Sequence, residues 1–189
     1  MFDSHCDVAA IVYGRRDDPD CLLQEFVADL KRSGVRLTGL IQCNRIFGSA
    51  VGHVPVMVLP EESVIRLGHN VDSCQSCSLA ANALIEAARN IGLAIDRGTD
   101  LLVINRFGKM EVEGRGLVDQ IYRAVVADIP VLATVPEQHF TVWTKFSRGM
   151  SVKLQCSRKQ LDEWWRSVCG HSDRARSESL ASTFCEFVK

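Results

Sequence analysis

The sequence predicts an α/β protein with a three-layer, mainly parallel sheet and a β-hairpin insertion. Short apolar runs, which are typical of buried strands, alternate along the chain with amphipathic runs of helical period. The segment Asp100–Ile104 is the most apolar of the short runs, which indicates a strand buried on both faces of a parallel sheet. Two further short runs lie on either side of Pro60, and they predict the hairpin.

The amino-terminal part is predicted to form a strand, a helix and a second strand. Val8–Tyr13 is partly β-branched and is followed by Gly14, as expected of a short strand. Leu22–Leu30 carries apolar residues at helical spacing, and Gly34 stands where such a helix should end. Val35–Gln42 then completes a crossover unit of roughly 35 residues.

The middle of the chain contains the hairpin and a long helix. Val54–Leu59 and Ser63–Leu67 are the two expected hairpin strands. His69–Ser78 is polar and is predicted to be a loop, whereas Leu79–Arg97 has one apolar face and is predicted to be a helix. The buried strand Asp100–Ile104 follows it.

The last third continues the alternation more weakly. The expected elements are a helix at Leu117–Val125, a strand at Pro130–Thr134, a helix at Gln138–Ser147, a strand at Ser151–Leu154 and a helix at Lys159–Val168. Residues 1–169 are therefore expected to form a single domain, with 170–189 as a polar carboxy-terminal tail. Within that tail Leu180, Phe184 and Phe187 are spaced to form a final helical turn.

Composition narrows the class of protein. The 189 residues are 47% hydrophobic, and 22 Lys and Arg against 23 Asp and Glu give a net charge of −1. Without a basic excess we expect no nucleic acid partner, and without an apolar run of membrane-spanning length or a signal peptide we expect a cytoplasmic protein with no membrane insertion. The eight cysteines are expected to be reduced thiols, most of them buried.

Ligands of such sheets bind at the carboxyl ends of the strands, so the loop after the first strand is a candidate site. It carries neither Gly-x-Gly-x-x-Gly nor Gly-x-x-x-x-Gly-Lys-Ser/Thr, and its aspartates already complement the helix dipole. Triphosphate cradling is therefore disfavoured. Arg15 and Arg16 are left to reach an anion, unless the loop is only a solvated turn.

The segment Asn105–Gly116 is the second candidate, because it follows the most buried strand. It combines three cations, two carboxylates and three glycines with Asn105; the charged residues are Arg106, Lys109, Arg115, Glu111 and Glu113. Arginine gives forked recognition of an oxyanion, and glycine allows close backbone approach. The alternative is a turn whose charges are merely solvated.

The third candidate is the pair Cys74 and Cys77 with His69 in the polar loop. A Cys-x-x-Cys pair suits zinc or redox chemistry, and Cys77 is predicted to stand just before a helix that would lower its pKa. A closed zinc site needs four ligands, however, and no second pair exists. A metal is therefore disfavoured, and a redox thiol or an incidental pair stays open.

The chain resembles the bacterial domain-of-unknown-function family 2478, which is related to P-loop nucleoside-triphosphatases. The matching strings are Val8–Tyr13, Gly39–Gln42, Leu102–Gly116 and Ile129–Val135, together with the Leu22–Gly34 helix. The resemblance implies a P-loop-like α/β fold for residues 1–169 and an association with molybdate transport or nucleotide binding. Asn105-Arg106 stands where related triphosphatases carry magnesium-binding acids, and Cys77-Ser78-Leu79 stands where family members tend to have Cys-Arg-Leu.

The predicted function is non-hydrolytic binding of a nucleotide or small oxyanion by a degenerate P-loop-like site, in an accessory protein for molybdate or metal-cofactor handling. The expected ligand residues are Arg15, Arg16, Asn105, Arg106, Lys109 and Arg115. One alternative is a nucleoside-triphosphatase or phosphotransferase that uses Glu111 or Glu113 as base, and another is a thiol or metal accessory protein. A small anion is the expected partner, and a homo-oligomer or a protein partner stays open.

Overall fold

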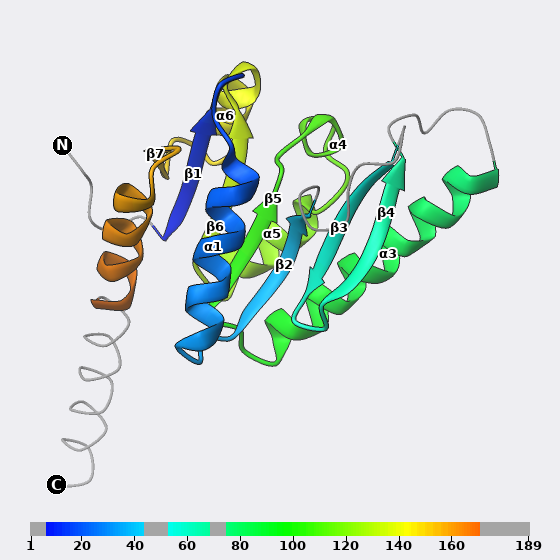
Figure 1. Ribbon diagram of the computed structural model, residues 1–189, viewed down its shortest axis with the longest axis horizontal. Coiled ribbons are helices and arrows are strands. Elements are labelled where there is room, and N and C mark those ends of the chain that lie inside the picture. The colour runs from blue at the N-terminus through cyan, green and yellow to red at the C-terminus, as the bar shows by residue number, and fades with distance from the viewer. Residues whose placement is uncertain (1–6, 44–52, 69–74, 171–189) are drawn as a thin grey trace, which may run out of the picture.

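The computed structural model describes residues 7–43, 53–68 and 75–170, which contain a seven-stranded sheet (Figure 1). The strand order is β4-β3-β2-β5-β6-β1-β7. The strands are β1 (Val8–Tyr13), β2 (Leu37–Gln42), β3 (His53–Leu59), β4 (Ser63–Gly68), β5 (Leu101–Asn105), β6 (Val131–Pro136) and β7 (Ser151–Gln155). Five of them are parallel, and β3 and β4 form an antiparallel hairpin on the edge beside β2. The mainly parallel sheet with a hairpin insertion is confirmed.

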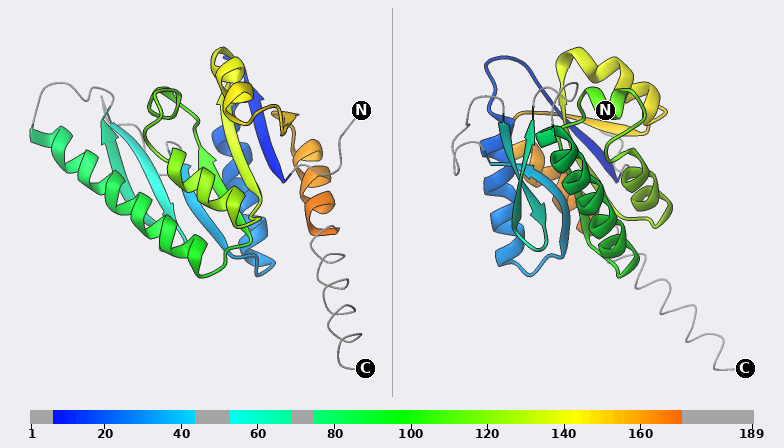
Figure 2. Two further views of the ribbon diagram at one scale, coloured as in Figure 1. Left: turned by 180° about the vertical axis from the view of Figure 1, so that it is seen from behind. Right: turned by 90° about the vertical axis from the view of Figure 1, so that its right-hand side faces the viewer.

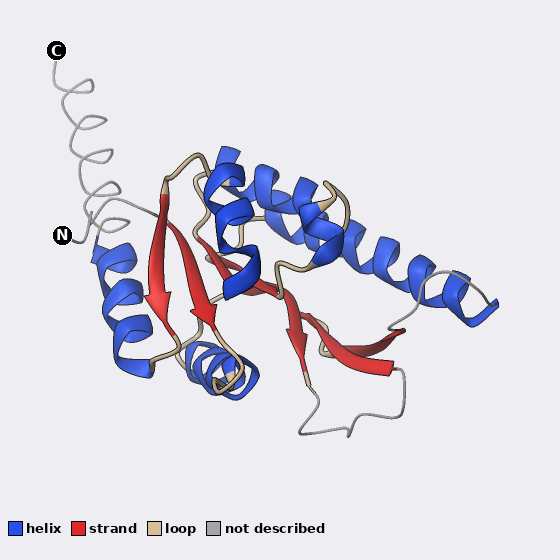
Figure 3. Ribbon diagram, turned by 90° about the horizontal axis from the view of Figure 1, so that it is seen from above, coloured by secondary structure: helices blue, strands red, loops and turns tan. Residues whose placement is uncertain are grey.

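Helices cover both faces of the sheet. They are α1 (Pro19–Arg32), α3 (Gln75–Asp96), α4 (Lys109–Val112), α5 (Val118–Val126) and α6 (Phe140–Phe146), with a 3₁₀ turn η1 (Glu137–His139) and a helix over residues 158–170. In Figures 1 and 2, α1 and the helix over 158–170 lie on one face, and α3, α5 and α6 lie on the other. Seen from above, the sheet runs between the two groups of helices, which confirms three layers (Figure 3).

The core has two halves, one on each side of the sheet, because successive strand residues point to opposite faces. On β5, Leu101 and Val103 pack with α1, whereas Leu102 and Ile104 pack with α3 and α5. All five β5 residues are buried, as the sequence predicts for a strand between two helical layers. The sheet therefore holds the end of β5 rigidly, and this end leads into one of the candidate sites.

Gly39 allows β2 to approach β5 closely. Its φ of +135° is a conformation that favours glycine, and a Cβ atom here would lie 1.9 Å from the carbonyl oxygen of Val103. Any larger residue would push the two central strands apart.

Several elements differ from the sequence prediction. The long helix α3 begins at Gln75, not Leu79, because polar residues are tolerated in a first turn whose N–H groups need no intrahelical partner. The predicted helix at 138–147 divides into η1 and α6. A short helix, α4, occurs inside the segment expected to be a loop, where the Gly108 N–H donates to Glu111 Oε2 at 2.9 Å.

Candidate functional site

A cavity of about 510 Å³ lies at the carboxyl edge of the sheet, and we call it the carboxyl-edge cavity. It is lined by residues that end or follow three neighbouring parallel strands: Tyr13, Gly14 and Arg15 from β1, Arg106 from β5, and Pro136, Glu137 and Gln138 from β6. Tyr13 and Pro136 are register partners. From β1 the chain passes to α1 on one face and from β6 to α6 on the other, and such a divergence opens a crevice in doubly wound sheets (Figure 1).

Two backbone donors, one in the β1–α1 loop and one at the start of α1, are satisfied by aspartate side chains. The Gly14 N–H donates to Asp17 Oδ2 at 2.8 Å, and the Cys21 N–H donates to Asp18 Oδ1 at 3.0 Å at the start of α1. These are the donors that a phosphate-binding loop would offer to its ligand. Carboxylates occupy them here, so an anion has to bind through side chains.

The loop also reverses the charge of the phosphate-binding motif. When Gly-x-x-x-x-Gly-Lys-Ser/Thr is counted from Gly14, the second glycine falls on Pro19, the lysine on Asp20 and the hydroxyl residue on Cys21. A carboxylate thus stands at the start of α1 where this motif carries its phosphate-binding lysine.

Asp20 is buried and holds the end of β5. Its Oδ1 accepts a hydrogen bond from Asn105 Nδ2 at 3.1 Å, and its Oδ2 accepts one from Arg106 Nη2 at 3.1 Å. Thr134 Oγ1 in turn donates to Asn105 Oδ1 at 2.7 Å. This chain of hydrogen bonds joins β6, β5 and α1, and we call it the Asp20 network. Because Asn105 is buried and bonded at both ends of its amide, it supports Arg106 rather than lining the cavity.

The Tyr13 hydroxyl is buried without a hydrogen-bond partner within the described residues. Burial raises the pKa of Tyr13, with a smaller opposing effect from Arg106, so the group remains a protonated hydroxyl. The Arg106 guanidinium carbon lies 5.5 Å from the centre of the Tyr13 ring. A buried hydroxyl without a partner costs about 1–3 kcal/mol, which a ligand oxygen or a water would recover.

One other buried side-chain atom in the described ranges lacks a partner, the Oε1 of Gln120. Its Nε2 donates to the carbonyl oxygen of Ala88 at 3.1 Å, which places the amide between α5 and α3. Gln120 does not line the carboxyl-edge cavity. Of the two residues, Tyr13 is the one that lines the carboxyl-edge cavity.

The remaining basic candidates lie away from this cavity. Arg16 is exposed and is not among its lining residues. Arg115 forms an ion pair with Glu113, and Lys109 Nζ lies 4.0 Å from the same carboxylate. The hydrogen bond from Arg115 lowers the pKa of Glu113. Of the six residues expected to bind the anion, the structure brings Arg15 and Arg106 together.

Glu111 has a role within its own loop. Its two carboxylate oxygens accept hydrogen bonds from the Gly108 N–H at 2.9 Å and the Leu117 N–H at 3.3 Å. Gly116 has a φ of +66°, and a Cβ atom there would lie 2.0 Å from Glu111 Oε1. The glycines of this segment therefore let Glu111 close the loop around α4, and neither Glu111 nor Glu113 lines the carboxyl-edge cavity.

The cysteine candidates are placed only in part. His69 and Cys74 lie outside the described residues, and Cys77 falls in the first turn of α3 rather than before it. Among the other described cysteines only Cys43 is buried, whereas Cys21, Cys156 and Cys169 are half-buried, so the expectation of mostly buried thiols is wrong for this group. The described ranges contain no cluster of three His, Cys, Asp or Glu side chains that could hold a metal. No described helix is both long and apolar enough to cross a membrane.

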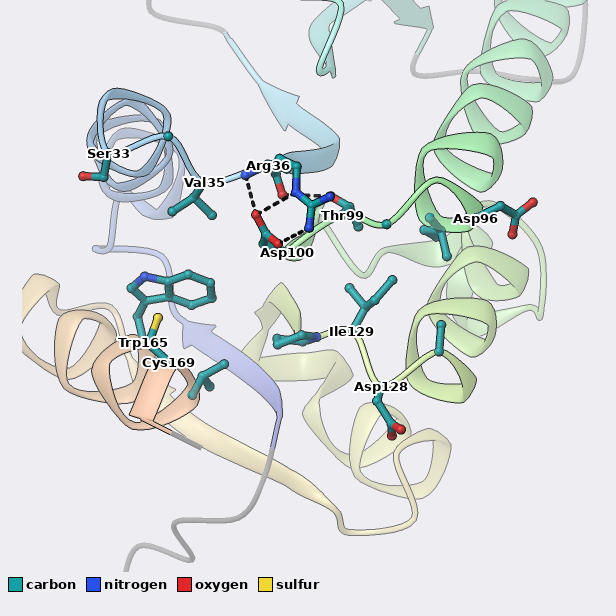
Figure 4. Close-up of a pocket in the computed structure, with 16 residues that line it drawn as sticks. Ser33, Val35, Arg36, Asp96, Thr99, Asp100, Asp128, Ile129, Trp165 and Cys169 are labelled. Carbon is teal, nitrogen blue, oxygen red and sulfur yellow. Dashed lines mark hydrogen bonds and ion pairs between the residues drawn. The ribbon is translucent and has the colours of Figure 1, made fainter. Parts of the chain in front are cut away.

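A second cavity, also of about 510 Å³, lies at the opposite edge of the sheet, and we call it the amino-edge cavity (Figure 4). Arg36 and Asp100 stand at one side, where the guanidinium donates to both carboxylate oxygens at 2.6 and 3.1 Å. The Arg36 N–H also donates to Asp100 at 2.9 Å. Val35, Ile129 and Trp165 supply apolar walls.

Sequence reasoning missed four residues around the carboxyl-edge cavity: Tyr13, Asp20, Thr134 and Glu137. The position of Asp20 in the phosphate-loop frame was a usable signal. Tyr13 gave a weaker signal, because it is the last residue of a strand and ligands bind at the carboxyl ends of strands. Thr134 and Glu137 carry no local signal, because they reach the site only through the pairing of β6 with β1 and β5.

Comparison with known proteins identifies the family to which the chain is similar. The family model described as "Protein of unknown function (DUF2478)" matches residues 8–164. The chain is 37% identical over 178 residues to the molybdenum import ATP-binding protein ModC 2 of Bradyrhizobium diazoefficiens. That alignment covers 90% of this chain but 19% of the relative, so the chain spans about a fifth of the relative's length.

Among solved structures, the chain is similar to the solution structure of a human cancer-related nucleoside triphosphatase. The TM-score is 0.53 at 15% sequence identity, and the match covers 78% of this chain and 87% of the other. At this identity the similarity shows a shared α/β fold.

Proposed function

The chain belongs to the DUF2478 family and has a nucleoside-triphosphatase-like fold, and from this premise we propose that it binds a nucleotide phosphate or a small oxyanion without hydrolysing it. The site is the carboxyl-edge cavity, between Arg15 and Arg106. The observation that carries the proposal is that Tyr13, whose buried hydroxyl has no hydrogen-bond partner in the described structure, lines the same cavity as Arg15 and Arg106.

The two arginines are suited to different roles in binding. Arg106 is held by Asp20 through one Nη2 bond, which leaves its other N–H groups for a ligand. Arg15 is exposed, and the described residues offer it neither an ion pair nor a hydrogen bond. We infer that Arg106 is the fixed donor and Arg15 the adaptable one, with the Tyr13 hydroxyl as a third donor. Such a set fits the oxygens of a tetrahedral anion.

Several features support binding without hydrolysis. Asp20 and Cys21 stand at the motif positions of the phosphate-binding lysine and the magnesium-binding hydroxyl. The buried amide of Asn105 stands at the end of β5, where related triphosphatases have acids. Glu111 and Glu113 are engaged within the α4 loop, so no observation favours either as a base. The alternative based on Cys74 and Cys77 concerns side chains outside the described structure.

The likeness to a molybdenum import ATP-binding protein supports an accessory role in molybdate or metal-cofactor handling. Molybdate is therefore a second anion for the test, beside phosphate and nucleotides. The cytoplasmic location and a homo-oligomer or protein partner remain predictions of this proposal.

Thermal unfolding in the presence of inorganic phosphate, molybdate, AMP and ATP tests the proposal. A ligand at about 100 times its Kd stabilises by about 2.7 kcal/mol, which corresponds to a rise in Tm of roughly 5–10 °C for a chain of this size. Arg106→Gln and Arg15→Gln should reduce this rise, whereas Arg16→Gln, a neighbouring exposed arginine outside the cavity, should not. If no anion raises the Tm at millimolar concentration, the proposal is wrong. Phosphate release from ATP with magnesium should stay at the level of buffer.

A further inference from the structure

Glu137 lies at the mouth of the carboxyl-edge cavity, directly after β6. The register of β6 with β1 pairs Pro136 with Tyr13, so the next residues, Glu137 and Gly14, stand at the same level. A Cβ atom built on Gly14 would lie 3.6 Å from Glu137 Oε2. The Glu137 carboxylate therefore lies beside Gly14, on the side of the cavity that β6 supplies.

This carboxylate has no salt bridge or hydrogen bond within the described residues, although Arg15 and Arg106 line the same cavity. The aspartates of the neighbouring β1–α1 loop and helix start are all engaged, since Asp17 accepts from Gly14, Asp18 caps α1, and Asp20 holds Arg106. Glu137 thus does not serve to neutralise the arginines. It presents an unused acceptor to whatever the arginines bind.

A hydrogen-bond acceptor at an anion site distinguishes anions that still carry a proton from anions that carry none. A fully deprotonated tetrahedral anion brings no hydrogen-bond donor and is repelled by a carboxylate. An anion that still carries a proton can donate it in a hydrogen bond to the carboxylate while its other oxygens face the arginines. Phosphate monoesters have a second pKa of about 6 and keep a protonated fraction near and below that pH, whereas inorganic phosphate still carries a proton as hydrogen phosphate throughout the neutral range. Molybdate and sulfate lose their protons well below that range.

We propose that Glu137 is a specificity-determining residue that selects a protonated phosphate, either hydrogen phosphate or a phosphate monoester, against molybdate and sulfate. This inference rests on the proposed function and chooses phosphate over molybdate as the anion that the site binds. Arg15 and Arg106 attract all these anions alike, and the Glu137 carboxylate makes the affinity for a protonated phosphate higher than the affinity for molybdate or sulfate.

The other charged groups near Glu137 come from three elements. Asp17 and Arg15 belong to the β1–α1 loop, and Arg106 follows β5 and pairs with Asp20 of α1. His139 belongs to η1, the same 3₁₀ turn as Glu137. Hydrogen phosphate keeps a proton across pH 6.5–8, whereas a phosphate monoester loses its last proton above its second pKa of about 6. The affinity for AMP should therefore fall as the pH rises through this range, and the hydrogen bond from hydrogen phosphate to Glu137 should persist.

Isothermal titration of the full chain with inorganic phosphate, sulfate, molybdate and AMP tests the inference. Wild type should bind phosphate at least about tenfold more tightly than sulfate or molybdate, the range of one charge-assisted hydrogen bond. Glu137→Gln should bring this ratio near one, mainly by improving sulfate and molybdate binding, and should flatten the pH dependence of AMP binding. Glu61→Gln, the same change at an exposed glutamate in the β3–β4 turn, should leave the ratio unchanged. At pH 6, where much of the AMP keeps its phosphate proton, AMP binding as tight as phosphate identifies a nucleotide monoester as the ligand, and weaker AMP binding identifies free phosphate.

Two results would overturn the inference while leaving the proposed function intact. Sulfate or molybdate binding as tightly as phosphate to wild type is one, and an unchanged ratio in Glu137→Gln is the other. Absence of binding by every anion would overturn both proposals together. Because Glu137 is exposed, Glu137→Gln should unfold at the wild-type temperature without ligand, and this separates a change in specificity from a loss of folding.

Discussion

The two cavities at opposite edges of the sheet have the same volume of about 510 Å³ but differ in how their polar groups are satisfied. At the amino edge, Arg36 and Asp100 bind each other through both carboxylate oxygens, and Thr99 donates to the Arg36 carbonyl oxygen. At the carboxyl edge, the Tyr13 hydroxyl has no partner within the described residues, and Arg15 has none either.

The difference shows that volume alone does not identify a ligand site. The amino-edge cavity joins the ends of helices to the starts of strands, and its charges stabilise that junction. The carboxyl-edge cavity keeps donors unpaired at a cost to the folded state, which is the usual property of a binding site. Variants at the two edges should therefore behave differently, and the following four predictions test this contrast.

The largest effect is expected for Asp20→Asn, which removes the negative charge and one of the two acceptor oxygens at the centre of the Asp20 network and puts an amide NH₂ donor in its place. The carboxylate side chain is 11% exposed and bonds two side chains, so its loss should lower the free energy of unfolding by about 2–3 kcal/mol. Urea unfolding at pH 7 measures it. Asp119→Asn, an exposed aspartate in the first turn of α5, should cost less than about 0.5 kcal/mol. Equal costs for the two variants would show that the network does not hold this edge.

Replacing one arginine at each edge of the sheet separates effects on stability from effects on anion binding. Arg36→Gln should lower the free energy of unfolding only slightly, because its bidentate pair with Asp100 is partly exposed to solvent, and should leave anion affinity unchanged. Arg106→Gln should weaken phosphate binding by about tenfold or more, since it removes a charged donor. Urea unfolding and calorimetric titration of both variants provide the data. An effect of Arg36→Gln on anion affinity would contradict the contrast between the edges.

Tyr13→Phe should have opposite effects on stability and binding. Without ligand, removing a buried hydroxyl that has no partner should leave the free energy of unfolding unchanged or raise it by up to about 1 kcal/mol. Phosphate affinity should fall several-fold. Tyr122→Phe, at the exposed tyrosine of α5, is the matched control and should change neither quantity. A clear loss of stability in Tyr13→Phe would mean that the hydroxyl has a structural partner.

The smallest effect is expected for Cys156, whose thiol lies near Asp17 and Asp18 of the β1–α1 loop. Burial, followed by the charges of Asp17 and Asp18, raises the pKa of Cys156 from 9.0 to about 11. The folded state therefore holds this proton more tightly than the unfolded chain. Its contribution to stability is present below pH 9 and is lost as the pH rises toward 11.

Unfolding of wild type and Cys156→Ala between pH 8 and 11 measures this contribution as a difference. Because the residue is half-buried, we expect less than about 1 kcal/mol. Tyr13, whose pKa is also raised, contributes in the same direction to both proteins, so the comparison isolates the thiol. Parallel curves for the two proteins would contradict the prediction.

Much of the fold follows from the sequence, because strand and helix periods are local properties. The buried character of β5 and the hairpin around Pro60 were both readable from runs of apolar residues. Helix starts were less readable, and α3 begins four residues before its apolar face does. The α4 turn was missed because a glutamate side chain, not periodicity, holds it.

For the site, the sequence by itself determined that the phosphate-binding motif is absent and that arginines follow β1 and β5. Local composition fixes these facts, whatever the chain folds into. Only the tertiary structure decided which cations share a cavity, that Asn105 and Asp20 hold Arg106, and that Glu137 stands beside Gly14. The physical reason is strand order: β1 lies next to β6 and not β2, so residues more than a hundred positions apart meet at one edge of the sheet.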